Sequence, residues 1–247
     1  MRIDSAGWTH VGRRAHNEDA WTSRADLGLF VVADGMGGYA GGEVASRCVV
    51  DTFSGLCERL VRDPEATWPH CRHPQLSHEE DLLLNCTRLA QRAVRARRQG
   101  PLHRMGSTVV ALALGAQGAA VAHVGDSRLY RLRAGCLESL TRDHSILEEM
   151  RQAGVKMASR ADSPYGHLIT RALGTDSAEP TVRRLDVQAG DVYLLCSDGL
   201  YEPLGPERLA ARLGEGAPEG LAERLVEEAY ELGGRDNITA VLVSVRE

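Results

Sequence analysis

The stretch Leu29-Phe-Val-Val-Ala-Asp34-Gly-Met-Gly-Gly38 places five apolar residues directly before a carboxylate and a glycine-rich turn. A continuous apolar run of this kind predicts a strand that is buried on both faces. Asp34 then lies where the chain leaves the strand, and Gly35, Gly37 and Gly38 can adopt backbone angles that other residues avoid. A carboxylate at the rim of a core strand needs a partner, because an isolated charge is costly to bury.

The same pattern occurs twice more along the chain. Ala119–Val124 leads into Gly125-Asp126-Ser127, and Val192–Cys196 leads into Ser197-Asp198-Gly199. An aspartate beside a glycine is most often part of a plain turn. If the three strands are neighbours, however, their carboxylates converge and repel one another unless protons or cations intervene. Divalent Mg²⁺ and Mn²⁺ prefer oxygen ligands, so the pattern predicts a metal site.

The composition indicates one ordinary globular protein. A chain of 247 residues can bury one sizeable core, so we expect a single domain over residues 1–247. The net charge of -5 argues against a nucleic-acid partner. No stretch approaches the roughly 18 apolar residues of a membrane span, and the N-terminus lacks the apolar core of a signal peptide. We therefore expect a cytoplasmic protein that does not bind a membrane.

Periodicity assigns most helices and strands. Helices are predicted at Gly41–Leu60, Glu79–Arg98, Ser145–Ala153, Pro206–Leu213 and Pro218–Leu232. Strands are predicted at Ile3–Val11, Ser107–Leu114, Ala119–Val124, Arg128–Arg133, Thr181–Leu185, Val192–Cys196 and Ile238–Val245. Strands joined by short turns must be antiparallel. The order of elements therefore predicts an α+β fold, an α/β sandwich of two antiparallel sheets flanked by pairs of helices.

Several polar residues suggest a common chemistry. Asp34, Asp126, Asp198 and Asp236 lie at predicted strand ends or turns, and the Arg14–Asp19 segment adds an arginine and two acidic residues, Glu18 and Asp19. Such carboxylates can hold two divalent cations that activate a bridging water, and a nearby arginine can bind two oxygens of a phosphate. The chemistry that these residues favour is attack of a metal-activated hydroxide on a phosphate monoester.

Seven motifs in order give the chain a close resemblance to bacterial metal-dependent protein phosphatases of the PPM family, the type 2C serine/threonine phosphatases. The motifs are Arg14-Ala-His-Asn-Glu-Asp19, Val32-Ala-Asp34-Gly-Met-Gly-Gly38, Gly106-Ser-Thr108, His123-Val-Gly-Asp126-Ser-Arg128, Leu140-Thr-Arg-Asp143-His144-Ser145, Cys196-Ser-Asp198-Gly199 and Gly234-Arg-Asp236-Asn237. One such motif is a weak signal, whereas seven in order across nearly the whole chain are a strong one.

The resemblance implies a binuclear centre of two Mn²⁺ or Mg²⁺ ions. Asp34 is implied to bridge both ions and to act in catalysis, and Gly35 to lend its carbonyl oxygen to one of them. Asp198 and Asp236 are implied to hold the other ion.

Further roles follow from the same resemblance. Glu18 and Asp19 are implied to orient metal-bound waters, Arg14 to act in catalysis by binding the substrate phosphate, and Thr108 to support the site from behind. The predicted reaction is hydrolysis of phosphoserine and phosphothreonine on proteins.

Two positions depart from the family pattern. Asp126 matches a position linked to a third, weaker metal ion, but its usual aspartate partner is replaced here by Glu202. Many eukaryotic members have a histidine, proposed as the general acid, where this chain has Met36, so protonation of the leaving group is unassigned. The segment 143–170 corresponds to the family's variable flap beside the site.

The resemblance also implies partners. We expect phosphorylated protein substrates, a cognate serine/threonine kinase whose action is reversed, and a monomer. Two alternatives stay open: a catalytically inactive scaffold or binding module, and a hydrolase of small phosphoesters. An inactive member should have lost at least one of Asp34, Asp198 and Asp236, and all three are present.

Overall fold

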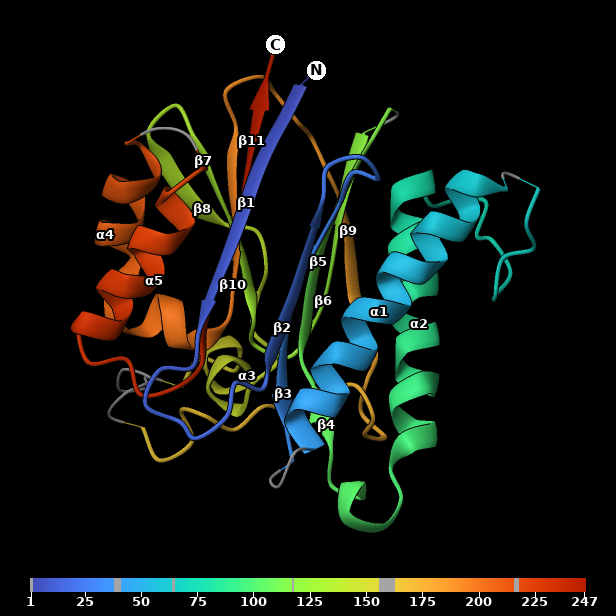
Figure 1. The fold of residues 1–247 in the computed structure, drawn as a ribbon, viewed down its shortest axis with the longest axis horizontal. Coiled ribbons are helices and arrows are strands. Elements are labelled where there is room, and N and C mark those ends of the chain that lie inside the picture. Colours follow the sequence, from blue (N-terminus) through green and yellow to red (C-terminus); the bar gives the residue numbers. More distant parts are fainter. Residues whose placement is uncertain (1, 38–40, 64, 117, 156–162, 216–217) are drawn as a thin grey trace.

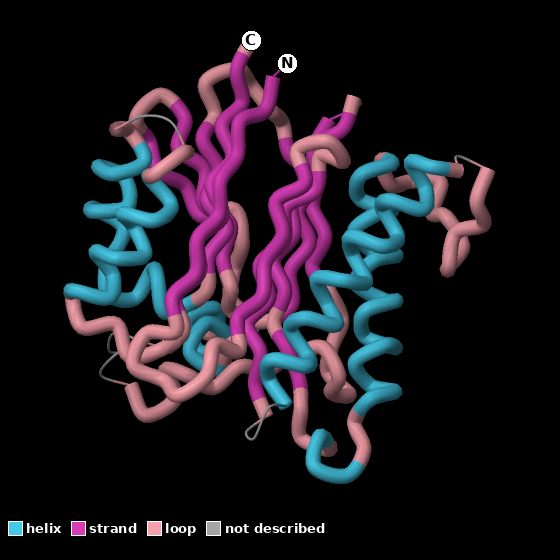
Figure 2. Tube along the Cα trace, viewed as in Figure 1, coloured by secondary structure: helices cyan, strands magenta, loops and turns pink. Residues whose placement is uncertain are grey.

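Two antiparallel sheets form the centre of the molecule. The structure is a computed structural model that describes residues 2–37, 41–63, 65–116, 118–155, 163–215 and 218–247. The sheets pack face to face, and a pair of helices covers the outer face of each (Figure 1). Figure 2 shows the same layers, with the strands inside and the helices outside. The predicted sandwich of two sheets flanked by paired helices is confirmed.

The strand order places distant parts of the chain side by side. The first sheet has the order β1-β11-β10-β7-β8. Its strands are β1 (Arg2–His10), β7 (Arg128–Arg133), β8 (Cys136–Ser139), β10 (Val192–Cys196) and β11 (Ile238–Arg246). The second sheet has the order β2-β3-β5-β6-β9, with β4 paired to β3. Its strands are β2 (Asp19–Arg24), β3 (Leu29–Met36), β4 (Gly106–Ser107), β5 (Val109–Gly115), β6 (Gly118–Val124) and β9 (Thr181–Leu185).

Strand β3 is buried on both faces, as its apolar run predicts. Leu29, Val31 and Ala33 lie in the cluster that packs under helices α1 (Gly41–Arg62) and α2 (His78–Arg97), whereas Phe30 and Val32 belong to the core between the two sheets. This alternation follows from the strand geometry, in which successive side chains point to opposite faces. The run is apolar throughout because each face meets another layer of the protein.

Four long helices form the outer layers. They are α1 (Gly41–Arg62) and α2 (His78–Arg97) on the second sheet, and α4 (Asp198–Leu213) and α5 (Leu221–Glu231) on the first. The shorter helices are α3 (Ile146–Gln152) and a 3₁₀ turn at Gly100–Leu102. Helix α2 begins with a capping box: Glu80 N–H donates to Ser77 Oγ, and Ser77 N–H donates to Glu80 Oε2. Among the described helices, none is both long and apolar enough to cross a bilayer.

Some predicted boundaries were wrong. Asp34 lies inside β3, which continues to Met36 because Gly35 and Met36 pair with β4. Asp198 lies in the first turn of α4 rather than in a strand turn, and the α4 assignment is interrupted at Gly205, whose φ is 68°. The short strands β2, β4 and β8 were not predicted. Gly38 and residues 156–162 of the predicted flap lie outside the described residues.

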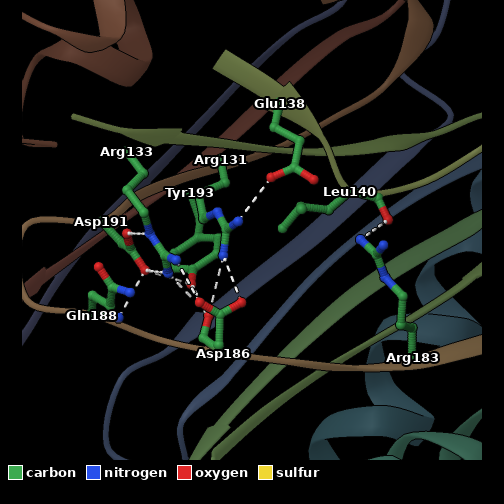
Figure 3. A network of polar contacts seen from close by, with 9 residues as sticks. All are labelled: Arg131, Arg133, Glu138, Leu140, Arg183, Asp186, Gln188, Asp191 and Tyr193. Carbon is green, nitrogen blue, oxygen red and sulfur yellow. Dashed lines mark hydrogen bonds and ion pairs between the residues drawn. The ribbon is translucent and has the colours of Figure 1, made fainter. Parts of the chain in front are cut away.

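Ion pairs hold the connection by which the chain passes from β9 in one sheet to β10 in the other. Asp191 is buried and accepts hydrogen bonds from Arg133 Nε at 2.6 Å, from Arg133 Nη2 at 2.7 Å and from Tyr193 Oη at 2.9 Å (Figure 3). Arg131 Nη1 donates to Asp186 Oδ1 at 3.2 Å. The connection is therefore fixed to β7 through Arg131 and Arg133.

Candidate metal centre

Five aspartates gather at one edge of the sandwich. Asp19 on β2 lies directly opposite Asp34 on β3 in the antiparallel register. Burial, together with the charges of Asp19, Asp198, Asp126 and Asp236, raises the pKa of Asp34 well above its usual value. Like charges at this range disfavour ionisation unless a cation balances them. The structure thus brings the predicted carboxylates together.

Asp19 is held from the opposite sheet. Its Oδ2 accepts hydrogen bonds from Ser197 Oγ at 2.8 Å and from Thr239 Oγ1 at 2.6 Å. Its Oδ1 is buried and has no hydrogen-bond partner among the described residues. Burial raises the pKa of Asp19 to about 6, although the two hydroxyl donors oppose that shift. A buried carboxylate oxygen without a donor fits a site for a cation or for an ordered water bound to one.

Glu18 joins the start of α1 to the end of β3. Its Oε1 accepts a hydrogen bond from Gly42 N–H at 3.2 Å, and its backbone oxygen accepts from Gly35 N–H at 3.1 Å. A side chain at Gly35 would meet the Gly42 carbonyl oxygen at 2.0 Å. Only glycine therefore allows the two backbones to approach this closely beside Asp34.

Asn237 fixes the loop that carries Arg14. Its Nδ2 donates to the backbone oxygens of Val11 and His16, both at 2.9 Å, and its Oδ1 accepts from Glu18 N–H at 2.7 Å. Gly12 also packs closely against this segment, because its φ is +64° and a Cβ there would lie 1.8 Å from the Asp236 carbonyl oxygen. The loop from residue 11 to residue 18 is thereby tied to the Asp236 turn.

Arg14 lies at the rim of the carboxylate cluster. Its Nη2 donates to Asp236 Oδ2 at 2.7 Å, while 59% of its side chain is exposed. A guanidinium has further donors in its planar fork, so Arg14 can pair with Asp236 and still bind a ligand oxygen.

Thr108 supports Asp34 through the backbone. Its Oγ1 accepts a hydrogen bond from Asp34 N–H at 3.0 Å and lies 2.7 Å from Ser127 Oγ, while its own N–H donates to the Asp34 carbonyl oxygen at 2.8 Å. Thr108 is buried. Its hydrogen bonds therefore fix the backbone of Asp34 within the strand.

Thr108→Val is expected to lower the affinity of the centre for Mn²⁺ by about 10- to 100-fold, the usual cost of losing a group that orients a metal ligand. The valine keeps the volume but removes the acceptor for Asp34 N–H. Calorimetric titration of metal-free protein measures the affinity. Thr108→Ser retains the hydroxyl and should bind Mn²⁺ almost as the unaltered protein does. An unchanged affinity in Thr108→Val would contradict the supporting role.

Asp198 and Glu202 lie on one side of α4, four positions apart. Together with His167, their donor atoms lie within 4.8 Å of one another. Asp126 is near, because Tyr201 Oη on α4 donates to its backbone oxygen at 3.2 Å.

Four residues of the site received no individual role from the sequence: Ser197, Thr239, Asn237 and His167. Ser197 and Asn237 lie inside quoted motifs, directly before Asp198 and directly after Asp236, and that position was the available signal for them. The contacts of Thr239 and His167 depend on the pairing of distant segments, which periodicity does not reveal.

Comparison with known proteins identifies the family. The sequence model described as Protein phosphatase 2C matches residues 6–227. The chain belongs to the protein phosphatase 2C family. It is 35% identical to the serine/threonine protein phosphatase PstP of Mycobacterium tuberculosis over 94% of this chain and 43% of PstP. It is 30% identical to the protein phosphatase PhpP of Streptococcus pneumoniae over 97% of this chain and 96% of PhpP.

A solved structure of a family member matches the whole fold. The catalytic domain of PstP in complex with 2 manganese ions superposes with a TM-score of 0.84 at 33% identity, covering 99% of each chain. The chain spans less than half of the full length of PstP, although it spans nearly all of PhpP.

Proposed function

We propose that this chain is a metal-dependent protein phosphatase that hydrolyses phosphoserine and phosphothreonine monoesters. The observation that carries the proposal is the gathering of four aspartates around Asp34, which raises its pKa at the edge where both sheets meet. Family membership and the names of PstP and PhpP support it. We also propose that residues 1–247 act as one phosphatase domain, with 143–170 as its flap.

Two Mn²⁺ or Mg²⁺ ions are the proposed cofactors. Asp34 would contact both, with the Gly35 carbonyl oxygen on one ion and with Asp198 and Asp236 on the other. When bound, the ions supply positive charge opposite the phosphate and a water of lowered pKa. The unpaired Oδ1 of Asp19 and the high pKa of Asp34 both fit such a loaded centre.

The surrounding residues position the substrate and the solvent. Glu18 and Asp19 would orient water, since each is already fixed by hydrogen bonds to another element. Arg14 would bind two phosphate oxygens through its fork, and the hydrogen bond to Asp236 holds it toward the centre. Thr108 would keep Asp34 in place. Asp126 and Glu202 would contribute to a third, weaker metal site.

The proposed substrates are phosphorylated proteins. We further propose that the protein acts as a monomer in the cytoplasm and opposes a serine/threonine kinase, as the resemblance to bacterial members implies. The inactive-scaffold alternative is disfavoured because every carboxylate required for the metal pair is retained.

A peptide assay tests this function. With Mn²⁺, the protein should release phosphate from a phosphothreonine peptide much faster than from a small metabolite phosphate, and thorough chelation should remove the activity until Mn²⁺ is restored. Full activity in excess chelator would overturn the metal mechanism. Preference for the metabolite would favour the small-molecule phosphoesterase, and inactivity on both with metal bound would favour the scaffold.

A further inference from the structure

The two ends of the flap are joined by backbone hydrogen bonds between the residues at the start of α3 and residues 168–170. Ile146 N–H donates to the Leu168 carbonyl oxygen at 3.0 Å, and Thr170 N–H donates to the His144 carbonyl oxygen at 2.8 Å. His167 directly precedes one of these anchored positions. It lies in a turn closed by a hydrogen bond from Leu168 N–H to the Tyr165 carbonyl oxygen at 3.1 Å. The backbone thus presents the imidazole from a defined position.

The imidazole lies toward α4. His167 Nδ1 is 3.9 Å from Glu202 Oε1, and the donor atoms of His167, Asp198 and Glu202 all lie within 4.8 Å of one another. The side chain of His167 remains 70% exposed, so a hydrated ion can reach it. Small movements of two long side chains would bring these atoms to the roughly 2 Å distances of a coordination shell.

We propose that His167 is a ligand supplied by the flap to a cation held with Asp198 and Glu202, and that this site takes a divalent transition metal in preference to Mg²⁺. The inference rests on the proposed function, because Asp198 also belongs to the proposed metal pair. It adds a nitrogen donor to a region for which the sequence predicted only Asp126 and Glu202.

The donor set determines the choice of metal. Carboxylate and water oxygens suit Mg²⁺ and Mn²⁺ alike, whereas imidazole nitrogen favours first-row transition ions and is a poor ligand for Mg²⁺. The substitution of glutamate for the usual aspartate places the carboxylate one methylene farther from α4, toward the flap. An ion bound here would join the flap to α4, so occupancy and flap position become linked.

Metal binding to the full chain tests the proposal without relying on activity. Metal-free protein is titrated calorimetrically with Mn²⁺ and separately with Mg²⁺. His167→Ala should weaken Mn²⁺ binding at the weakest site by at least about 10-fold, while Mg²⁺ affinity changes by less than about 2-fold. Mn²⁺ should also slow amide hydrogen exchange over residues 165–170 in the unaltered protein, and that protection should be lost in His167→Ala.

Tyr165→Ala is the matched control. Tyr165 is exposed in the same turn and offers no donor to the cluster, while its backbone hydrogen bond is retained. It should bind Mn²⁺ as the unaltered protein does. Equal Mn²⁺ affinity with and without His167, or equal losses for Mn²⁺ and Mg²⁺, would overturn the proposal.

The two proposals fail separately. A chain that shows the His167 effect on Mn²⁺ but hydrolyses no phosphopeptide would overturn only the proposed function. An active phosphatase whose weakest Mn²⁺ site keeps its affinity in His167→Ala would overturn only the proposal that His167 is a metal ligand.

Discussion

Asp34→Asn is expected to lower phosphatase activity by at least about 10³-fold, because it removes the carboxylate that we propose to contact both ions, in a centre worth several kcal/mol of transition-state stabilisation. The same substitution should raise the free energy of unfolding of the chelated protein. The pKa of Asp34 is raised by burial and by Asp19, Asp198, Asp126 and Asp236, so its ionised form destabilises the metal-free fold at neutral pH. A neutral amide removes that repulsion while keeping the side-chain shape.

Activity on a phosphothreonine peptide and urea unfolding in chelator at pH 7 measure the two effects. Asp51→Asn is the matched control, since Asp51 is exposed on α1 and is not one of the carboxylates of the site. It should change neither quantity appreciably. Retained activity in Asp34→Asn would contradict the proposed role of Asp34 in catalysis. A loss of stability in chelator would contradict the repulsion between Asp34 and the neighbouring carboxylates.

Acid destabilisation through a buried histidine is the second large effect. His144 stacks on His123 with ring centroids 4.5 Å apart. Burial, with the charges of His123 and Arg171, lowers the pKa of His144 to about 3 from 6.5, although Asp143 opposes the shift. Burial also lowers the pKa of His123. The Nδ1 of His144 accepts from Gly125 N–H at 3.2 Å, so the neutral ring is built into the fold.

The sign follows from proton uptake. The unfolded chain protonates His144 below about pH 6.5, whereas the folded chain does so only near pH 3, so unfolding takes up a proton between these values. The contribution of the neutral His144 ring to the free energy of unfolding is fully present above the pKa of His144 in the unfolded chain, and it is lost as the pH falls below that value. The slope is about 1.4 kcal/mol per pH unit for His144, or about 5 kcal/mol over the whole interval.

The free energy of unfolding in urea is measured for the unaltered protein and for His144→Gln at several pH values between about 4 and 7, which fall largely between the two pKa values of His144. The glutamine variant should show a shallower loss of stability on acidification, by about one proton's slope. Both proteins contain Asp19 and Asp34, whose raised pKa values favour the folded state in acid. Their contribution therefore cancels when the free energy of unfolding of one protein is subtracted from that of the other at each pH. His103→Gln, an exposed histidine, should leave the slope unchanged. Identical slopes for His144→Gln and the unaltered chain would refute the assignment.

Sequence patterns predicted the fold where periodicity was strong. Gly41–Leu60 and Glu79–Arg98 were identified as helices because their apolar residues recur at helical spacing, and the structure places helices there within a few residues. The β3 strand was identified as buried on both faces because its apolar run from Leu29 to Ala33 is uninterrupted. Strand β2, at Asp19–Arg24, was missed because its residues are mostly polar and only half-buried at the sheet edge.

The candidate site was predicted in its members but not in its geometry. Motif order put Asp34, Asp198 and Asp236 in the predicted site, yet Asp34 lies inside a strand, because the pairing of Gly35 with Ser107 and of Met36 with Gly106 extends β3 past it. The helical position of Asp198 was missed since Pro203 and Gly205 disguise the first turns of α4. The approach of His167 to Glu202 depends on how the flap folds back, which no local pattern encodes.

The shared edge of the sandwich has a mechanical consequence. Asp34 belongs to the second sheet, whereas Asp198 and Asp236 adjoin β10 and β11 of the first. Any ion that these side chains hold in common acts as a cross-link between the two sheets. Removing it would leave that edge joined only by hydrogen bonds such as those from Ser197 and Thr239 to Asp19, whereas arginine–aspartate pairs hold the β9–β10 connection at the other end of the strands.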